Sequence, residues 1–139
     1  MKADYLVDRV RSRPGHPTLL AKLFHSRHGE KLFLGLPGNP QSSIVGLMTL
    51  GAPAISSLLG KNVEELPMVV TRDELSAPEN FNRLVLGNLV DGEFMQGKHL
   101  GSAMLRSLAF ATGFAVAPSG ATAPGSKIRW LKPAITRKR

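Results

Sequence analysis

The stretch that decides the fold runs from residue 34 to residue 43 and reads Leu34-Gly35-Leu36-Pro37-Gly38-Asn39-Pro40-Gln41-Ser42-Ser43. Its first residues close an apolar segment, residues 31–36, whose composition is typical of a strand. Asn39 is a favourable helix N-cap, and Pro40 suits the first helical position, where a missing N–H is tolerated. The sequence therefore predicts a strand, a tight turn and a helix in immediate succession.

An α/β unit can be built outward from this stretch. Residues 19–24 predict a second strand, joined to residues 31–36 by a polar turn, and a short extended segment with Leu6, Val7 and Val10 precedes both. Pro53 should kink the helix and Gly60 should cap its end. Its apolar face would be formed by Ile44, Val45, Leu47, Met48, Ile55, Leu58 and Leu59. We expect this unit to occupy residues 1–60.

The pattern of predicted elements changes after residue 60. Four short strands are predicted at residues 68–71, 83–90, 114–117 and 128–131, separated by Gly, Pro and Asp-Gly turns. Residues 102–108 carry apolar side chains at helical spacing and predict one short helix. We expect a small β-rich domain over residues 61–135, followed by a basic tail at residues 136–139 that is a solvated chain end.

Composition narrows the classes of function. The 139 residues include no cysteine, which excludes disulfides and thiolate chemistry, and no apolar run is long enough to predict a membrane span. A cytoplasmic location is therefore expected, with no membrane partner. The net charge of +8 favours anionic ligands, but nucleic-acid binding is not expected, because basic residues are not interleaved with aromatic ones.

Two loops carry the candidate chemistry. At the first, the free N–H groups of Gln41, Ser42 and Ser43 and the dipole of the predicted helix would form an anion site, with the two serine hydroxyls as further donors. The alternative is a tight turn that only caps a helix. The second loop is Arg13-Pro14-Gly15-His16-Pro17, where two prolines fix the backbone and Arg13 and His16 can reach a ligand.

The alternative for this second loop is a surface β-turn. Both loops follow predicted strands, however, and in α/β sheets ligands gather beyond the carboxyl ends of the strands. The two loops are therefore expected to line one rim of the sheet.

These two loops and residues 101–109, which read Gly-Ser-Ala-Met-Leu-Arg-Ser-Leu-Ala, together resemble three blocks of the molybdopterin molybdenumtransferase family, in the same order. That family includes the E domain of gephyrin. The resemblance implies that residues 1–60 are the later part of a molybdopterin-binding α/β domain and that a small barrel-like β-domain follows. It also implies molybdenum insertion into adenylylated molybdopterin with release of AMP, in a cytoplasmic enzyme that forms homodimers.

The resemblance also assigns residues to the two substrates. The molybdate pocket would be lined by His16, Pro17, Ser42, Arg83 and Ser102. Molybdopterin and its phosphate would contact Arg13, Gly15, Pro37, Gly38, Asn39, Pro40 and Ser43. A tetrahedral oxyanion requires fixed donors and positive charge, which a helix N-terminus, hydroxyls and a guanidinium provide without a metal ligand.

Two features separate this chain from the family pattern. The family usually has lysine at the position of His16, and often at that of Arg13, so the charge beside the oxyanion would depend on pH. The family's glycine- and serine-rich loop, whose acidic residue serves magnesium and catalysis, is expected upstream of this chain, and Asp4-Tyr5 does not replace it. The catalytic residue and the magnesium ligands are therefore expected to be absent. The alternative to an incomplete enzyme is a non-catalytic binding or assembly module that needs a partner for the upstream half.

One possible metal site, at His25 and His28, is not supported by the sequence. His25 and His28 are three residues apart, but they fall in a predicted turn without a third ligand nearby. No metal ligand is therefore assigned in this chain.

Overall fold

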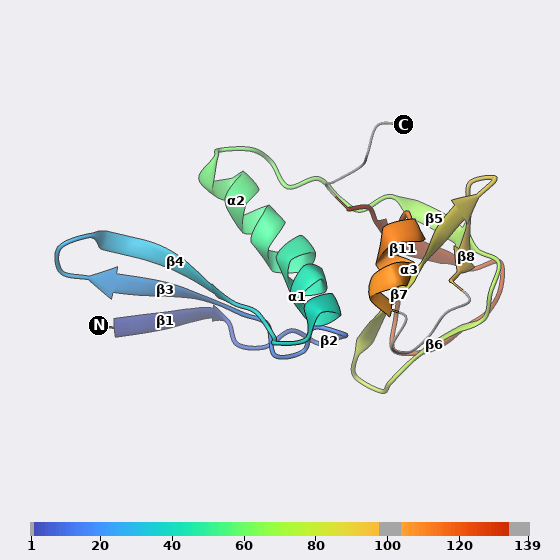
Figure 1. Ribbon diagram of the computed structural model, residues 1–139, viewed down its shortest axis with the longest axis horizontal. Helices are drawn as coiled ribbons and strands as arrows, with labels where there is room; N and C mark the ends of the chain where they lie inside the picture. The colour runs from blue at the N-terminus through green and yellow to red at the C-terminus, as the bar shows by residue number, and fades with distance from the viewer. Residues whose placement is uncertain (1, 98–103, 134–139) are drawn as a thin grey trace. The chain divides into compact units, whose positions relative to one another are not determined.

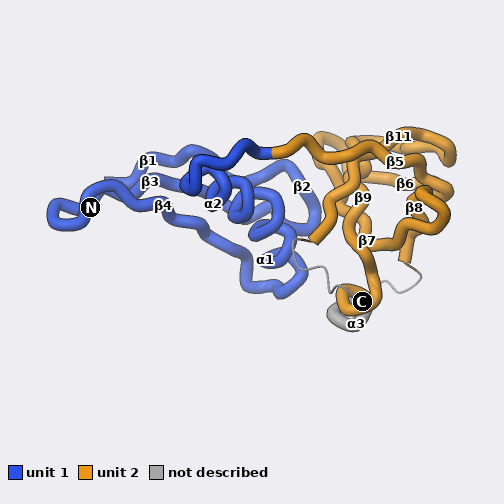
Figure 2. The backbone as a smooth tube through the Cα atoms, turned by 90° about the horizontal axis from the view of Figure 1, so that it is seen from above, with its two compact units in different colours: residues 1–63 blue, residues 64–139 orange. Residues whose placement is uncertain are grey.

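The computed structural model describes residues 2–97 and 104–133 of the chain (Figure 1). The chain divides into two compact units, Met1–Val63 and Glu64–Arg139, which Figure 2 shows in two colours. Each unit has its own sheet and its own core.

The sheet of the first unit is a three-stranded antiparallel one. Its order is β1 (Lys2–Val7), β3 (Leu19–His25) and β4 (Gly29–Gly35), which confirms the two strands predicted on either side of the polar turn. Between β1 and β3 lies a two-residue extended segment, β2 (Ser12–Arg13).

The register of this sheet brings the two candidate loops to one end. Val7 pairs with Leu20 and Leu19 pairs with Gly35, so β1 ends, β3 begins and β4 ends at the same edge. The shared rim was predicted from the rule for parallel sheets, and that reason is wrong for these strands. The central antiparallel strand β3 is what places both loops together.

A single helical column follows the second loop. It consists of α1 (Pro40–Gly46), a π-helical turn η1 (Leu47–Gly51) and α2 (Ala52–Leu58), and the backbone stays right-handed helical at both joints (Figure 1). In the π turn the N–H of Ala52 donates to the carbonyl of Leu47, five residues back. The turn directly precedes Pro53. Proline has no N–H for the usual helical hydrogen bond, and its ring clashes with the carbonyl four residues earlier. The structure thus accommodates the proline predicted to kink the helix.

The helix ends as the sequence predicts. Gly60 has a φ of 69°, its N–H donates to the carbonyl of Ser57, and the N–H of Lys61 donates to that of Ser56. These two bonds satisfy carbonyls that the helix leaves unpaired.

The helix packs on the sheet through glycines. A Cβ added to Gly46 would lie 2.5 Å from Oγ1 of Thr18, and one added to Gly51 would lie 2.9 Å from Cδ2 of Leu34. The helix and the sheet can therefore approach closely.

The predicted apolar face of the helix is mostly uncovered. Val45 is fully buried, whereas five other members of that face are between 37% and 69% exposed: Ile44, Leu47, Ile55, Leu58 and Leu59. The apolar pattern of the helix is therefore not matched by burial at these five residues. Within the described part of the first unit, one helix lies against three strands and nothing covers the far side of the helix.

The second unit is a closed five-stranded barrel, as the resemblance implied. Its strands follow one another around the barrel in the order β7 (Asn82–Val90), β8 (Glu93–Gln96), β5 (Met68–Thr71), β11 (Lys127–Leu131) and β9 (Gly113–Ala117). Pairing of β9 with β7 closes it. β6 (Leu75–Ala77) pairs with β10 (Gly120–Thr122), and α3 (Met104–Phe110) confirms part of the predicted helix.

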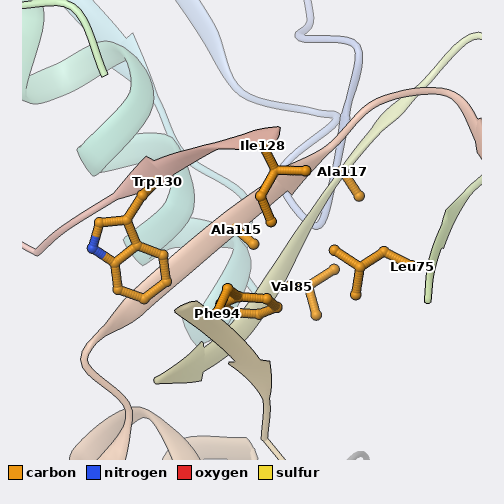
Figure 3. Close-up of a cluster of buried hydrophobic side chains, with 7 residues drawn as sticks. All are labelled: Leu75, Val85, Phe94, Ala115, Ala117, Ile128 and Trp130. Atoms are coloured by element: carbon orange, nitrogen blue, oxygen red, sulfur yellow. The ribbon is translucent and has the colours of Figure 1, made fainter. Parts of the chain in front are cut away.

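Apolar side chains from opposite sides of this barrel meet in its interior (Figure 3). The cluster consists of Leu75, Val85, Phe94, Ala115, Ala117, Ile128 and Trp130. Trp130 is 4% exposed, and its ring lies 5.8 Å from that of Phe94, so it is a packing residue of this core. Asp91 and Gly92 both have positive φ in the turn between β7 and β8, the conformation expected for an Asp-Gly hairpin. No helix among the described residues is long and apolar enough to cross a membrane.

Candidate functional site

The loop that follows β1 is closed by bonds between Val10 and His16. The N–H of Val10 donates to the carbonyl of His16 at 3.1 Å, and Nδ1 of His16 lies 2.7 Å from the carbonyl oxygen of Val10. A carbonyl oxygen can only accept, so Nδ1 carries the proton of this bond. The imidazole is thereby held in one orientation by the main chain.

Gly15 brings this loop against the first turn of α1. It is buried with a φ of 111°, and a Cβ added there would lie 3.2 Å from Cγ1 of Val45 and 3.9 Å from the carbonyl oxygen of Ser42. His16, which follows directly, therefore lies beside the start of the helix. The two predicted loops are neighbours in space.

The start of α1 offers fewer free donors than the sequence predicts. The N–H of Ser42 donates to Oδ1 of Asn39 at 3.1 Å, and the N–H of Ser43 donates to the carbonyl of Asn39 at 2.9 Å. The hydroxyl of Ser43 is turned to the carbonyls of Pro37 and Asn39. The prediction that these N–H groups and the Ser43 hydroxyl are free is therefore wrong.

Two donors remain at the helix start. Among the described residues, the N–H of Gln41 and the half-buried hydroxyl of Ser42 have no hydrogen-bond partner. Both lie in the first helical turn, where the dipole favours an anion and no acidic residue opposes it. Sequence reasoning did not single out Gln41 above its neighbours, because the capping pattern does not specify which of the first N–H groups Asn39 occupies.

Positive charge predominates on the loop that precedes His16. Arg9, Arg11 and Arg13 are exposed on the loop before His16, and Asp8 is the one acidic side chain of residues 8–18. Its ion pair with Arg9 spans 3.6 Å between two largely exposed side chains and is worth little. The arginines therefore leave a net positive field at the rim.

The arginine of the barrel unit that carries a shifted pKa has a different role. A hydrogen bond from Arg72 to Glu93 raises the pKa of the guanidinium, more than desolvation lowers it, and Asp91 adds a contact at 3.4 Å. Two carboxylates offset the charge of Arg72. Arg72 is consequently a poor candidate for binding an oxyanion.

The remaining predicted site residues divide between the units. Pro17, Pro37, Gly38 and Pro40 lie in the two loops of the first unit. Arg83 belongs to β7 of the barrel unit, where its Nη1 donates to the carbonyl of Ser76 at 3.3 Å. Ser102 lies outside the described residues.

A buried polar side chain supports the loop from below. Thr18 is fully buried, its N–H donates to the carbonyl of Gly15 at 2.9 Å, and its hydroxyl, which packs on Gly46, has no hydrogen-bond partner. Sequence reasoning missed this residue. Its only signal was a small polar residue between Pro17 and an apolar strand.

The histidine pair in the β3–β4 turn gives no sign of a metal site. The rings of His25 and His28 are stacked at 4.8 Å, and Nδ1 of His25 accepts from the N–H of Arg27. Over residues 2–97 and 104–133, no three His, Cys, Asp or Glu side chains are grouped so as to hold a metal ion. The described residues therefore do not provide a set of ligands that fits a magnesium ion.

The fold of this chain is that of molybdopterin biosynthesis MoeA proteins. A MoeA protein of Pyrococcus horikoshii superposes with a TM-score of 0.73 at 19% identity over 95% of this chain, and a second structure of that protein type from the same organism gives 0.67 at 16% over 91%. A molybdenum cofactor biosynthesis protein from Pyrococcus furiosus gives 0.69 at 21% over 92%. At these identities the likeness concerns the fold, and it confirms the fold that the resemblance implied.

This chain matches only part of those proteins. It spans 32% and 31% of the two Pyrococcus horikoshii chains and 45% of the Pyrococcus furiosus chain. No protein-family model matches the sequence, and no curated protein matches it at the sequence level.

Proposed function

We propose that this chain acts in molybdenum cofactor biosynthesis, by binding molybdate and adenylylated molybdopterin as part of a molybdenum-inserting transferase. The observation that carries the proposal is the approach of Gly15 to Val45 and Ser42 of α1. It brings together two loops that resemble separate blocks of the molybdopterin molybdenumtransferases, within a fold like that of MoeA proteins.

The chemistry of this rim suits a tetrahedral oxyanion. The N–H of Gln41 and the hydroxyl of Ser42 can donate to its oxygens, the helix dipole adds a partial positive charge, and nearby arginines attract it. His16 and Pro17 would form one side of the pocket. In the complete enzyme, Arg83 and Ser102 would add a guanidinium and a hydroxyl, and molybdenum would reach the dithiolene as the adenylate is released as AMP.

A second candidate is a binding module without turnover. The described residues contain no cluster that fits magnesium, and the rim has Asp8 alone as an acidic neighbour on its loop. In this version a partner provides the acidic residue and the metal, and this chain contributes the oxyanion half of the site.

One experiment separates these candidates. The purified chain is given adenylylated molybdopterin, molybdate and magnesium while AMP release is followed, and molybdate binding is measured in parallel by calorimetry. AMP release supports the complete enzyme, whereas binding without release supports the module. A folded chain that neither binds nor releases AMP contradicts the proposal.

Ser42 gives the sharpest variant for the binding arm. Ser42→Ala removes a hydroxyl that makes no internal bond, so it should weaken molybdate binding roughly 5- to 10-fold with the fold intact, as expected for one lost hydrogen bond. Ser57→Ala, an exposed serine of α2, is the matched control and should leave binding unchanged.

A further inference from the structure

Two contacts, each formed by a glycine and a side chain, seat the loop before β3 on α1. A Cβ added to Gly15 would lie 3.2 Å from Cγ1 of Val45. A Cβ added to Gly46 would lie 2.5 Å from Oγ1 and 3.0 Å from Cγ2 of Thr18. The loop provides the glycine in the first contact and the side chain in the second. Loop and helix therefore interlock at two points.

These two contacts bracket the loop residues that were assigned to the oxyanion pocket. The pair His16-Pro17 lies between Gly15 and Thr18 in the chain, and the N–H of Thr18 donates to the carbonyl of Gly15 at 2.9 Å, which closes the four residues into one turn. On the helix, Ser42 lies about one turn before the second contact. The separation between His16-Pro17 and the hydroxyl of Ser42 is therefore set by how closely the turn sits on α1.

The second contact acts through shape. Thr18 is fully buried, and its hydroxyl has no hydrogen-bond partner among the described residues. A buried hydroxyl without a partner lowers stability, so a hydrogen bond does not explain the threonine. Its side chain is branched at Cβ and therefore stiff, and it fills the space beside the backbone of Gly46. Thr18 is thus a spacer of fixed length between the loop and the helix.

We propose that Thr18, seated against Gly46, is a specificity-determining residue of the oxyanion site and fixes a pocket width that favours molybdate over sulfate. This inference rests on the proposed function, because it concerns the same site. Both ions are tetrahedral and carry the same charge, so the attraction exerted by the rim does not distinguish them. Sulfate is smaller, and walls held at a fixed separation can reject it. Thr18 acts through the loop, as a positioning residue.

Two single variants should change the pocket width in opposite directions. Gly46→Ala places a Cβ where Thr18 lies and pushes the loop away from the helix, so the molybdate-to-sulfate affinity ratio should rise. Thr18→Ala shortens the spacer and lets the loop settle onto the helix, so the ratio should fall. Each change should be about 10-fold, the lower end of what one methylene group contributes to discrimination in a pocket.

The double variant Thr18→Ala with Gly46→Ala moves the bulk from the loop to the helix and should return the ratio toward the wild-type value. Thr18→Val keeps the branched shape without the hydroxyl, so it should keep the ratio and raise the urea midpoint. Gly51→Ala is the matched control. A Cβ there would lie 2.9 Å from Cδ2 of Leu34, another tight contact with the sheet but farther along the column, so the midpoint should fall and the ratio should not change.

Calorimetric titrations of the whole chain with molybdate and with sulfate measure the ratio, and urea unfolding by far-UV circular dichroism shows that each variant is folded. If Gly46→Ala alone does not fold, Thr18→Ala and the double variant decide. A wild type that binds neither ion overturns the proposed function and this inference together. A wild type that binds molybdate overturns this inference alone in three cases: if it binds sulfate equally well, if Thr18→Ala leaves the ratio unchanged, or if Thr18→Val shifts the ratio as Thr18→Ala does.

Discussion

Gly15 is the residue on which the geometry of the candidate site depends. Its φ of 111° disfavours any side chain, and a Cβ added there would lie only 3.2 Å from Cγ1 of Val45 in α1. A larger residue there must move either the loop or the helix. The separation of His16 from Ser42 would then change.

Gly15→Ala should therefore destabilise the first unit by about 1–3 kcal/mol, the usual cost of a strained backbone position. Molybdate binding should weaken as well. Gly38→Ala is the matched control for stability, because no atom lies within 4 Å of a Cβ added there and its φ is not in the left-handed range. Urea unfolding followed by circular dichroism measures both variants, and equal midpoints would contradict this account.

At the scale of elements, the start of the helix is both a cap and part of the site. Asn39 accepts from the N–H of Ser42, which stabilises the helix and at the same time occupies a donor that an anion could use. An anion must either displace this side chain or rely on Gln41 and the Ser42 hydroxyl. Capping and binding therefore compete at this turn.

Asn39→Ala should lower the stability of the first unit by about 1 kcal/mol through loss of the cap. Because the N–H of Ser42 is released, molybdate should stabilise the variant more than it stabilises the wild type. Asn62→Ala, an exposed asparagine beyond the helix, should change neither value. Thermal unfolding with and without molybdate measures both effects, and identical ligand-induced shifts would show that the cap and the site are unrelated.

At the scale of the whole molecule, apolar burial is divided unequally. Among the described residues, Ala21 and Val45 are the buried hydrophobic residues of the first unit, whereas the barrel unit has ten. Burial of apolar surface is the main source of stability, so the barrel should be the more stable unit. The exposed segment between Gly60 and Glu65 separates the two cores.

Unfolding should therefore occur in two steps. Trp130, the only tryptophan, reports on the barrel core, while helical circular dichroism reports largely on the helix of residues 40–58. The circular dichroism signal should be lost at a lower urea concentration than the fluorescence signal. Phe94→Leu should move the second transition alone, and coincident transitions would show a single cooperative unit.

The sequence alone determined most of the local structure. Asn39 and Pro40 specified where the helix begins and Gly60 where it ends, because capping depends on a few neighbouring residues. Alternating apolar residues and the Asp91-Gly92 turn specified the main strands of the barrel. The short strands β6, β8 and β10 were not predicted, since three or four residues carry too little periodicity.

The tertiary structure decided what the site contains. It placed Gly15 against Val45 of the helix, a contact between residues far apart in the sequence. The orientation of the Ser43 hydroxyl toward Pro37 and Asn39, which leaves the N–H of Gln41 as the free donor, is local but is not specified by the capping pattern. It also left Ile44, Leu47, Ile55 and Leu58 exposed, although their pattern predicts burial. A periodic pattern shows which side chains favour burial, but only the arrangement of the surrounding elements decides whether anything covers them.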